Sequence, residues 1–148
     1  GTRPDRLEQG HALAAAVAEA VRYQPGSSAV DTTATEALEA GAGVCQDQAH
    51  VLVAAARSLG MPARYVTGYL YPGGETIGAE ATHAWAELHL DSYGWIGFDP
   101  ANGQCPTAEY VRLACGIDAM DAAPFRGSAL GTARESLDLD VQVRLAQQ

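Results

Sequence analysis

The chain has 148 residues, of which 9 are basic and 18 acidic, and its formal net charge at pH 7 is −9. With 47% hydrophobic residues it can form the core of one domain, and we expect residues 1–148 to be a single unit. All the basic residues are arginines, and they are scattered along the chain. Nucleic acids and anionic membranes attract clustered positive charge, so we expect neither as a partner. No apolar run approaches the roughly 20 residues that span a bilayer, and the first residues do not resemble a signal peptide, so we expect a cytoplasmic protein.

Two helices are predicted in the first 41 residues. Residues 5–23 are rich in alanine and carry apolar side chains at helical spacing, and this pattern ends before Pro25. Thr33 and Glu36 then have the spacing of a capping box, which predicts a short second helix that ends near Gly41.

A third helix is predicted over residues 44–59, because Gly60 follows as a helix terminator and Pro62 lies just beyond it. Cys45 lies at its start. The same helix face carries a set of apolar side chains at positions Ala49, Leu52, Val53, Ala56 and Leu59. We therefore expect the Cys45 thiol to point toward the protein body.

The rest of the chain has the period of two that is typical of strands. In residues 82–90, His83, Trp85, Glu87 and His89 share one face, and the apolar residues between them share the other. Helices therefore come first and strands afterwards, which favours an α+β fold with an antiparallel sheet. The expected strands cover residues 63–71, 82–90, 95–99, 110–114 and 137–145.

The register of one hairpin decides whether His83 and Asp99 can meet. Direct pairing of these two residues needs a connection of odd length centred on Asp91, or a bulge. A tight connection from Asp91 to Gly94 would instead pair Ala86 with Asp99 and turn Asp99 to the core face. A functional role for Asp99 therefore predicts the odd-length connection or the bulge.

Cys45, His83 and Asp99 have the residue types of a nucleophilic site. A helix start favours an anion and lowers the pKa of a thiol, and an imidazole held by a carboxylate can act as base and acid in acyl transfer. Taken alone, a cysteine at a helix start is more often a small buried apolar residue. Cys105 and Cys115 lack the close spacing of zinc ligands, so we interpret them as packing thiols, with a disulfide between them left open, and expect no metal.

Four strings resemble the bacterial transglutaminase-like superfamily, in that family's order. They are GVCQDQAH (43–50), RSLGMPARYVTGY (57–69), HAWAE (83–87) and GWIGFDP (94–100). With weaker similarity near the end, the resemblance covers about residues 23–127. It implies a papain-like α+β fold in which a helix that starts with the catalytic cysteine packs on an antiparallel sheet. It also implies that full-length relatives carry a small β-rich domain before this one, so we expect the chain to be part of a longer protein.

The resemblance implies a cofactor-free thiol enzyme. Cys45 would be the nucleophile, His83 the general base and acid, and Asp99 the residue that orients His83. The expected reaction is acyl transfer at a peptide or protein amide through a thioester, most simply by a cysteine protease or amidase. The alternatives are a protein-glutamine transglutaminase and, from another class, a catalytically silent scaffold that binds peptides.

Three further residues are candidates for substrate contacts. The superfamily's animal members use a tryptophan upstream of the nucleophile as an oxyanion donor, and none precedes Cys45 here. We expect the Cys45 amide to be one donor and Tyr23 or the Gln46 side chain to be the second. Trp85 shares the His83 face and is a candidate wall of the cleft, with sheet packing as the alternative.

Overall fold

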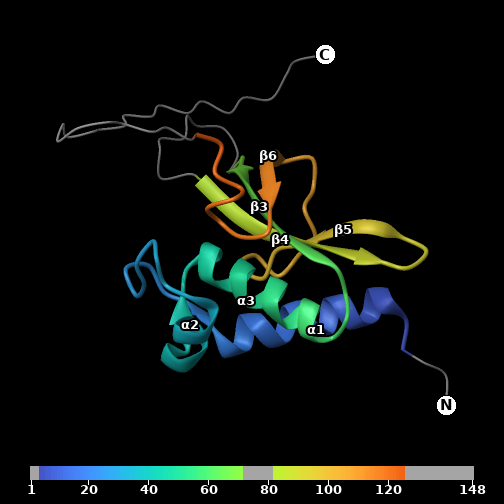
Figure 1. Cartoon of the computed structure of the whole chain (residues 1–148), viewed down its shortest axis with the longest axis horizontal. Helices are drawn as coiled ribbons and strands as arrows, with labels where there is room; N and C mark the ends of the chain where they lie inside the picture. The colour runs from blue at the N-terminus through green and yellow to red at the C-terminus, as the bar shows by residue number, and fades with distance from the viewer. Residues whose placement is uncertain (1–3, 72–81, 126–148) are drawn as a thin grey trace.

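The computed structural model describes residues 4–71 and 82–125. Three helices lie on one side of a four-stranded antiparallel sheet (Figure 1), so the predicted α+β class and the order of helices before strands are confirmed. Within the described ranges, no helix is long and apolar enough to cross a membrane. The strand predicted at 137–145 lies outside the described residues.

The first two helices begin at the caps that the sequence provides. α1 (Arg6–Ala20) begins after Asp5, whose carboxylate accepts a hydrogen bond from Leu7 N, and it ends three residues earlier than predicted. α2 (Ala34–Ala40) has the predicted capping box between Thr33 and Glu36. It ends at Gly41, whose φ of 66° is the left-handed conformation that glycine adopts most easily.

Two strands of two residues each, which the sequence did not predict, fix the chain ahead of the third helix. β1 (Arg22–Tyr23) pairs in parallel with β2 (Ala42–Gly43), so Tyr23 lies opposite Gly43. Elements this short carry no hydrophobic period, and only the tertiary pairing defines them.

α3 (Cys45–Ser58) is the central helix of the core. The apolar face predicted from its spacing is buried at Cys45, Ala49, Leu52, Val53 and Ala56. Leu59 was wrongly placed on that face: it is the C-cap, the chain leaves the helix there, and 59% of the residue is exposed.

The sheet has the strand order β5-β4-β3-β6, with all neighbours antiparallel. Its apolar face carries Ala84, Ala86, Leu88 and Leu90, which belong to the same core as the buried side of α3. The strands are β3 (Ala63–Leu70), β4 (Thr82–Leu90), β5 (Gly94–Phe98) and β6 (Tyr110–Gly116).

The hairpin of β4 and β5 has the predicted connection of odd length, residues 91–93, because Leu90 pairs with Gly94. The direct pairing of His83 with Asp99 was wrong, because the register instead sets Phe98 opposite Ala86. If this register is continued by one residue past Phe98, Asp99 lies diagonal to His83 on the same face of the sheet. Diagonal neighbours are within reach of long side chains, so the two residues still meet.

A bulge shifts the pairing of β6 with β3. The register changes at Gly68, which pairs with Arg112, and Leu113 is the extra residue. Because side chains alternate between the two faces, one extra residue moves Arg112 and Tyr110 onto the face that carries His83.

Candidate active site

Cys45 is the first residue of α3, and only 7% of it is exposed. The turn before it is held by the buried Asp47 carboxylate, which accepts hydrogen bonds from Val44 N (2.8 Å) and Ser28 Oγ (2.5 Å). A Cβ on Gly43 would lie 2.7 Å from the Asp47 Cβ, so the turn requires glycine. The thiol therefore lies in a fixed position at a helix start, where the first amides have no acceptor within the helix and the helix dipole favours an anion.

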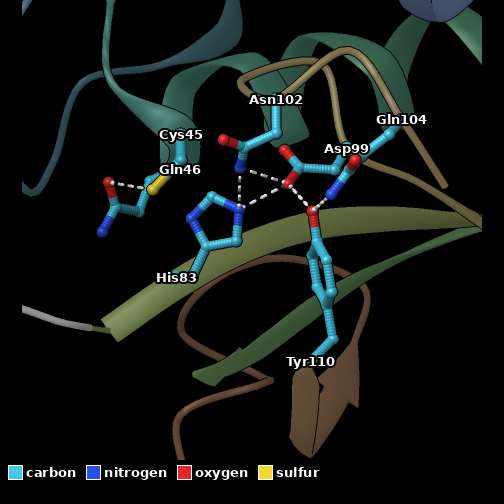
Figure 2. A network of polar contacts seen from close by, with 7 residues as sticks. All are labelled: Cys45, Gln46, His83, Asp99, Asn102, Gln104 and Tyr110. Carbon is cyan, nitrogen blue, oxygen red and sulfur yellow. Dashed lines mark hydrogen bonds and ion pairs between the residues drawn. The ribbon is translucent and has the colours of Figure 1, made fainter. Parts of the chain in front are cut away.

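His83 and Asp99 form a buried pair, in which His83 Nε2 lies 2.7 Å from Asp99 Oδ2. An ionised carboxylate only accepts hydrogen bonds, so this contact places a proton on Nε2. The other ring nitrogen, Nδ1, is on the side of Cys45 (Figure 2), and Cys45 is one of the groups that raise the pKa of His83. The structure thus brings the three predicted catalytic side chains together.

The charges of this site are set by its partners. Burial disfavours the charged imidazolium, but hydrogen bonds with Asp99 and Cys45 outweigh burial and raise the pKa of His83 to about 9. Burial also opposes ionisation of Asp99, whereas hydrogen bonds from His83, Asn102 and Tyr110 hold the pKa of its carboxyl below the ordinary value. The arrangement favours a charged imidazolium against an ionised carboxylate at neutral pH.

Two side chains of this network were missed in the sequence. Asn102 Nδ2 and Tyr110 Oη both donate to Asp99 Oδ2, at 2.7 and 2.6 Å. Asn102 follows Asp99 by three residues in a turn, and this short spacing could have indicated the contact. Nothing in the sequence indicates the contact of Tyr110, because Tyr110 reaches Asp99 only through the bulge in β6.

The other predicted site residues occupy different surroundings. Gln46 Oε1 accepts a hydrogen bond from Cys45 Sγ at 3.4 Å, so the Gln46 amide lies beside the thiol. The β1–β2 pairing sets Tyr23 opposite Gly43, which is two residues before Cys45, and Tyr23 is 55% exposed. Trp85 is buried, with its ring centroid 6.1 Å from that of His83, and it packs beneath the imidazole.

A pocket of about 210 Å³ opens beside Val44 and Gln46, the two chain neighbours of Cys45. His50 forms one wall and its imidazole is uncharged: Nε2 accepts a hydrogen bond from Ala119 N at 3.1 Å, and burial lowers the pKa of the ring. The pocket is lined further by Ser28, Ala29, Val30, Thr32, Val44, Gln46 and Asp47.

No group of three or more potential metal ligands occurs among residues 4–71 and 82–125. The three cysteines are free thiols, so Cys105 and Cys115 do not form the disulfide that the sequence left open.

A helix that begins with a buried cysteine, packed on an antiparallel sheet that carries a histidine, defines a papain-like α+β fold. The family model of the transglutaminase-like superfamily matches residues 1–100, a range that contains Cys45, His83 and Asp99. The chain belongs to this superfamily.

Related sequences and structures agree with this assignment. An uncharacterized protein of Mycobacterium leprae is 35% identical over 153 residues, and one of Mycobacterium tuberculosis is 38% identical over 130. These alignments cover 96% and 82% of this chain but only 53% and 41% of the relatives.

Two solved structures share the fold. A candidate cysteine protease from Cytophaga hutchinsonii superimposes with a TM-score of 0.67 at 34% identity, over 79% of this chain and 38% of that one. Calcium-bound LapG of Legionella pneumophila superimposes with a TM-score of 0.58 at 14% identity, over 86% of this chain and 75% of that one. The comparisons support a papain-like thiol enzyme.

Proposed function

We propose that this protein is a cysteine protease or amidase that cleaves an amide bond of a peptide or protein through a thioester on Cys45. The observation that carries the proposal is the buried contact of His83 Nε2 with Asp99 Oδ2 at 2.7 Å, which leaves Nδ1 on the side of the thiol. A cysteine that served only for packing would not need an oriented imidazole beside it.

The first half of the reaction forms the thioester. Cys45 Sγ, as thiolate, attacks the carbonyl carbon, and the carbonyl π electrons move to oxygen. When the tetrahedral intermediate collapses, the C–N bond breaks and the Nδ1 proton of His83 goes to the leaving nitrogen. Asp99 keeps the imidazole oriented throughout and retains its negative charge.

The second half releases the acid. Neutral His83 takes a proton from water at Nδ1, the hydroxide oxygen attacks the thioester carbon, and the C–S bond breaks to restore the thiolate. The Cys45 amide at the start of α3 is one donor to the oxyanion in both halves, and Gln46 or Tyr23 is the second.

The surroundings of the thiol have room for a peptide or protein substrate. The 210 Å³ pocket beside Gln46 gives room for the residues that flank the scissile carbonyl. If an amine instead of water attacked the same thioester, the reaction would be that of a transglutaminase. The two reactions then differ in the nucleophile that resolves the thioester.

Acylation by p-nitrophenyl acetate tests the proposal, because this ester reacts with activated thiols without a specific binding site. We expect a stoichiometric burst of p-nitrophenol in the wild type and none in Cys45→Ala. His83→Ala should lower the burst rate by roughly 10²–10⁴-fold. Cys105→Ala is the matched control and should keep the burst.

Three results would count against the proposal or redirect it. A wild type without a burst, or a burst that His83→Ala leaves unchanged, would support the silent scaffold instead. Incorporation of a dansylated amine into a Gln-rich protein, in preference to hydrolysis, would identify a transglutaminase.

A further inference from the structure

The Asp99 carboxylate is held almost entirely through one oxygen. His83 Nε2, Asn102 Nδ2 and Tyr110 Oη lie 2.7, 2.7 and 2.6 Å from Oδ2 (Figure 2). Oδ1 is buried and has no hydrogen-bond partner among the described residues. The three donors therefore share the charge of a single acceptor atom.

The direction of the Tyr110 hydrogen bond follows from its second partner. Gln104 Nε2 donates to the Tyr110 hydroxyl at 3.1 Å, so the hydroxyl proton is free to point to the carboxylate, which can only accept. Burial and the hydrogen bond to Asp99 raise the pKa of Tyr110 to about 12, so it keeps this proton.

The fold places Tyr110 at this point by a specific device. The bulge in β6 brings it to the outer face of the sheet, and its ring packs edge-on against Trp85 with centroids 5.2 Å apart. Bulges next to active sites commonly redirect one side chain, and here the redirected side chain reaches the partner of His83.

Donors that share one oxygen compete for its charge. The bond from Tyr110 makes Oδ2 a weaker acceptor for the imidazolium, so removing it should strengthen the hold of Asp99 on His83. Loss of orientation would act in the opposite direction. That effect is the smaller one, because Asn102 and two backbone hydrogen bonds between Asp99 and Gln104 (2.8 and 3.3 Å) still fix the carboxylate.

We propose that Tyr110 is a positioning residue that acts through Asp99 and limits how strongly the carboxylate stabilises the charged imidazolium form of His83. The imidazolium must give its Nδ1 proton to the leaving nitrogen, so an imidazolium that Asp99 stabilises too strongly at Nε2 would slow thioester formation. The inference rests on the proposed function of the Cys45–His83 pair.

The test is the rate of Cys45 alkylation by iodoacetate against pH, measured by peptide mass spectrometry. The imidazolium attracts this anionic reagent, so the rate should fall at high pH as His83 loses its proton. We expect Tyr110→Phe, which keeps the ring contacts, to move this fall upward by roughly half a pH unit. Tyr93→Phe is the matched control, because that hydroxyl donates to the exposed Asp5 at 3.0 Å.

A second variant keeps the test decisive if Tyr110→Phe does not fold. Gln104→Leu removes the donor that polarises the Tyr110 hydroxyl, so it should shift the fall in the same direction by a smaller amount. A fall that stays in place or moves to lower pH in the folded variants would overturn the role of Tyr110. A wild type with no such fall would instead overturn the Cys45–His83 pair itself.

Discussion

Both faces of the sheet are buried along β4. One face is buried by apolar packing, and the other by polar groups that are paired with one another. Toward the helices, Ala84, Ala86 and Leu88 are at most 2% exposed and belong to an apolar core. On the other face, His83 and Glu87 are each 9% exposed, and each depends on a charged partner from another strand or turn. The apolar face tolerates changes in detail as long as volume is kept, whereas the polar face depends on exact partners.

Glu87 shows how the polar face is neutralised. Its carboxylate accepts hydrogen bonds from Arg64 Nε at 2.6 Å and Arg112 Nε at 2.8 Å. The Arg64 guanidinium also lies 4.0 Å from the centroid of Trp95. Glu87 and Arg112 line the same pocket as the buried Trp85, whose ring centroid lies 6.1 Å from that of His83.

The largest loss of stability is expected on the apolar face. Leu88→Ala leaves a cavity at a fully buried position and should lower the free energy of unfolding by roughly 2–5 kcal/mol in urea titrations. The exposed Leu38→Ala in α2 is the matched control and should change it by less than about 0.5 kcal/mol. Equal effects of the two substitutions would contradict the division between the faces.

A smaller loss is expected on the polar face. Glu87→Gln keeps the shape but removes the charge, and should cost about 1–2 kcal/mol of unfolding free energy. The cost is limited because the Arg64 and Arg112 side chains are 29% and 43% exposed, so water can solvate them. Glu109→Gln, at an exposed position, is the control, and a Glu87→Gln loss no larger than that of the control would exclude a stabilising role for this network.

The His83–Asp99 pair also makes the stability of the protein depend on pH. The pKa of His83 is about 9 in the folded protein and ~6.5 in an unfolded chain, so the proton it binds favours the folded state. This contribution is complete below pH 6.5 and is lost as the pH rises to about 9. The melting temperature of the wild type should therefore fall more across this window than that of His83→Gln. Parallel curves for the two proteins would contradict it.

The sequence predicted the parts of the fold that depend on local patterns. The alternation over 82–90 matches β4, and the capping box at Thr33 matches the start of α2. The pairing of strands was harder to predict. β1 and β2 were missed, and the β4–β5 register differs from the one that would pair His83 directly with Asp99. Local residue preferences do not specify which distant backbone groups will pair.

The same division applies to the candidate site. The sequence segments that resemble a known superfamily contain Cys45, His83 and Asp99, and the structure places the side chains of these residues together. Tyr110 could not be found in this way, because one extra residue, Leu113, decides which face it occupies. A bulge changes the face of every residue beyond it without leaving a pattern in the local sequence.

The reactivity of Cys45 toward iodoacetamide as a function of pH tests the central claim most directly. Peptide mass spectrometry would follow the three cysteines separately, with Cys105 and Cys115 as references within the same chain. If Cys45 is paired with His83, it should react well below the ~8.5 at which a free thiol ionises, and His83→Ala should abolish that reactivity. A Cys45 profile that matches those of the other two thiols, or that His83→Ala leaves unchanged, would contradict a catalytic pair.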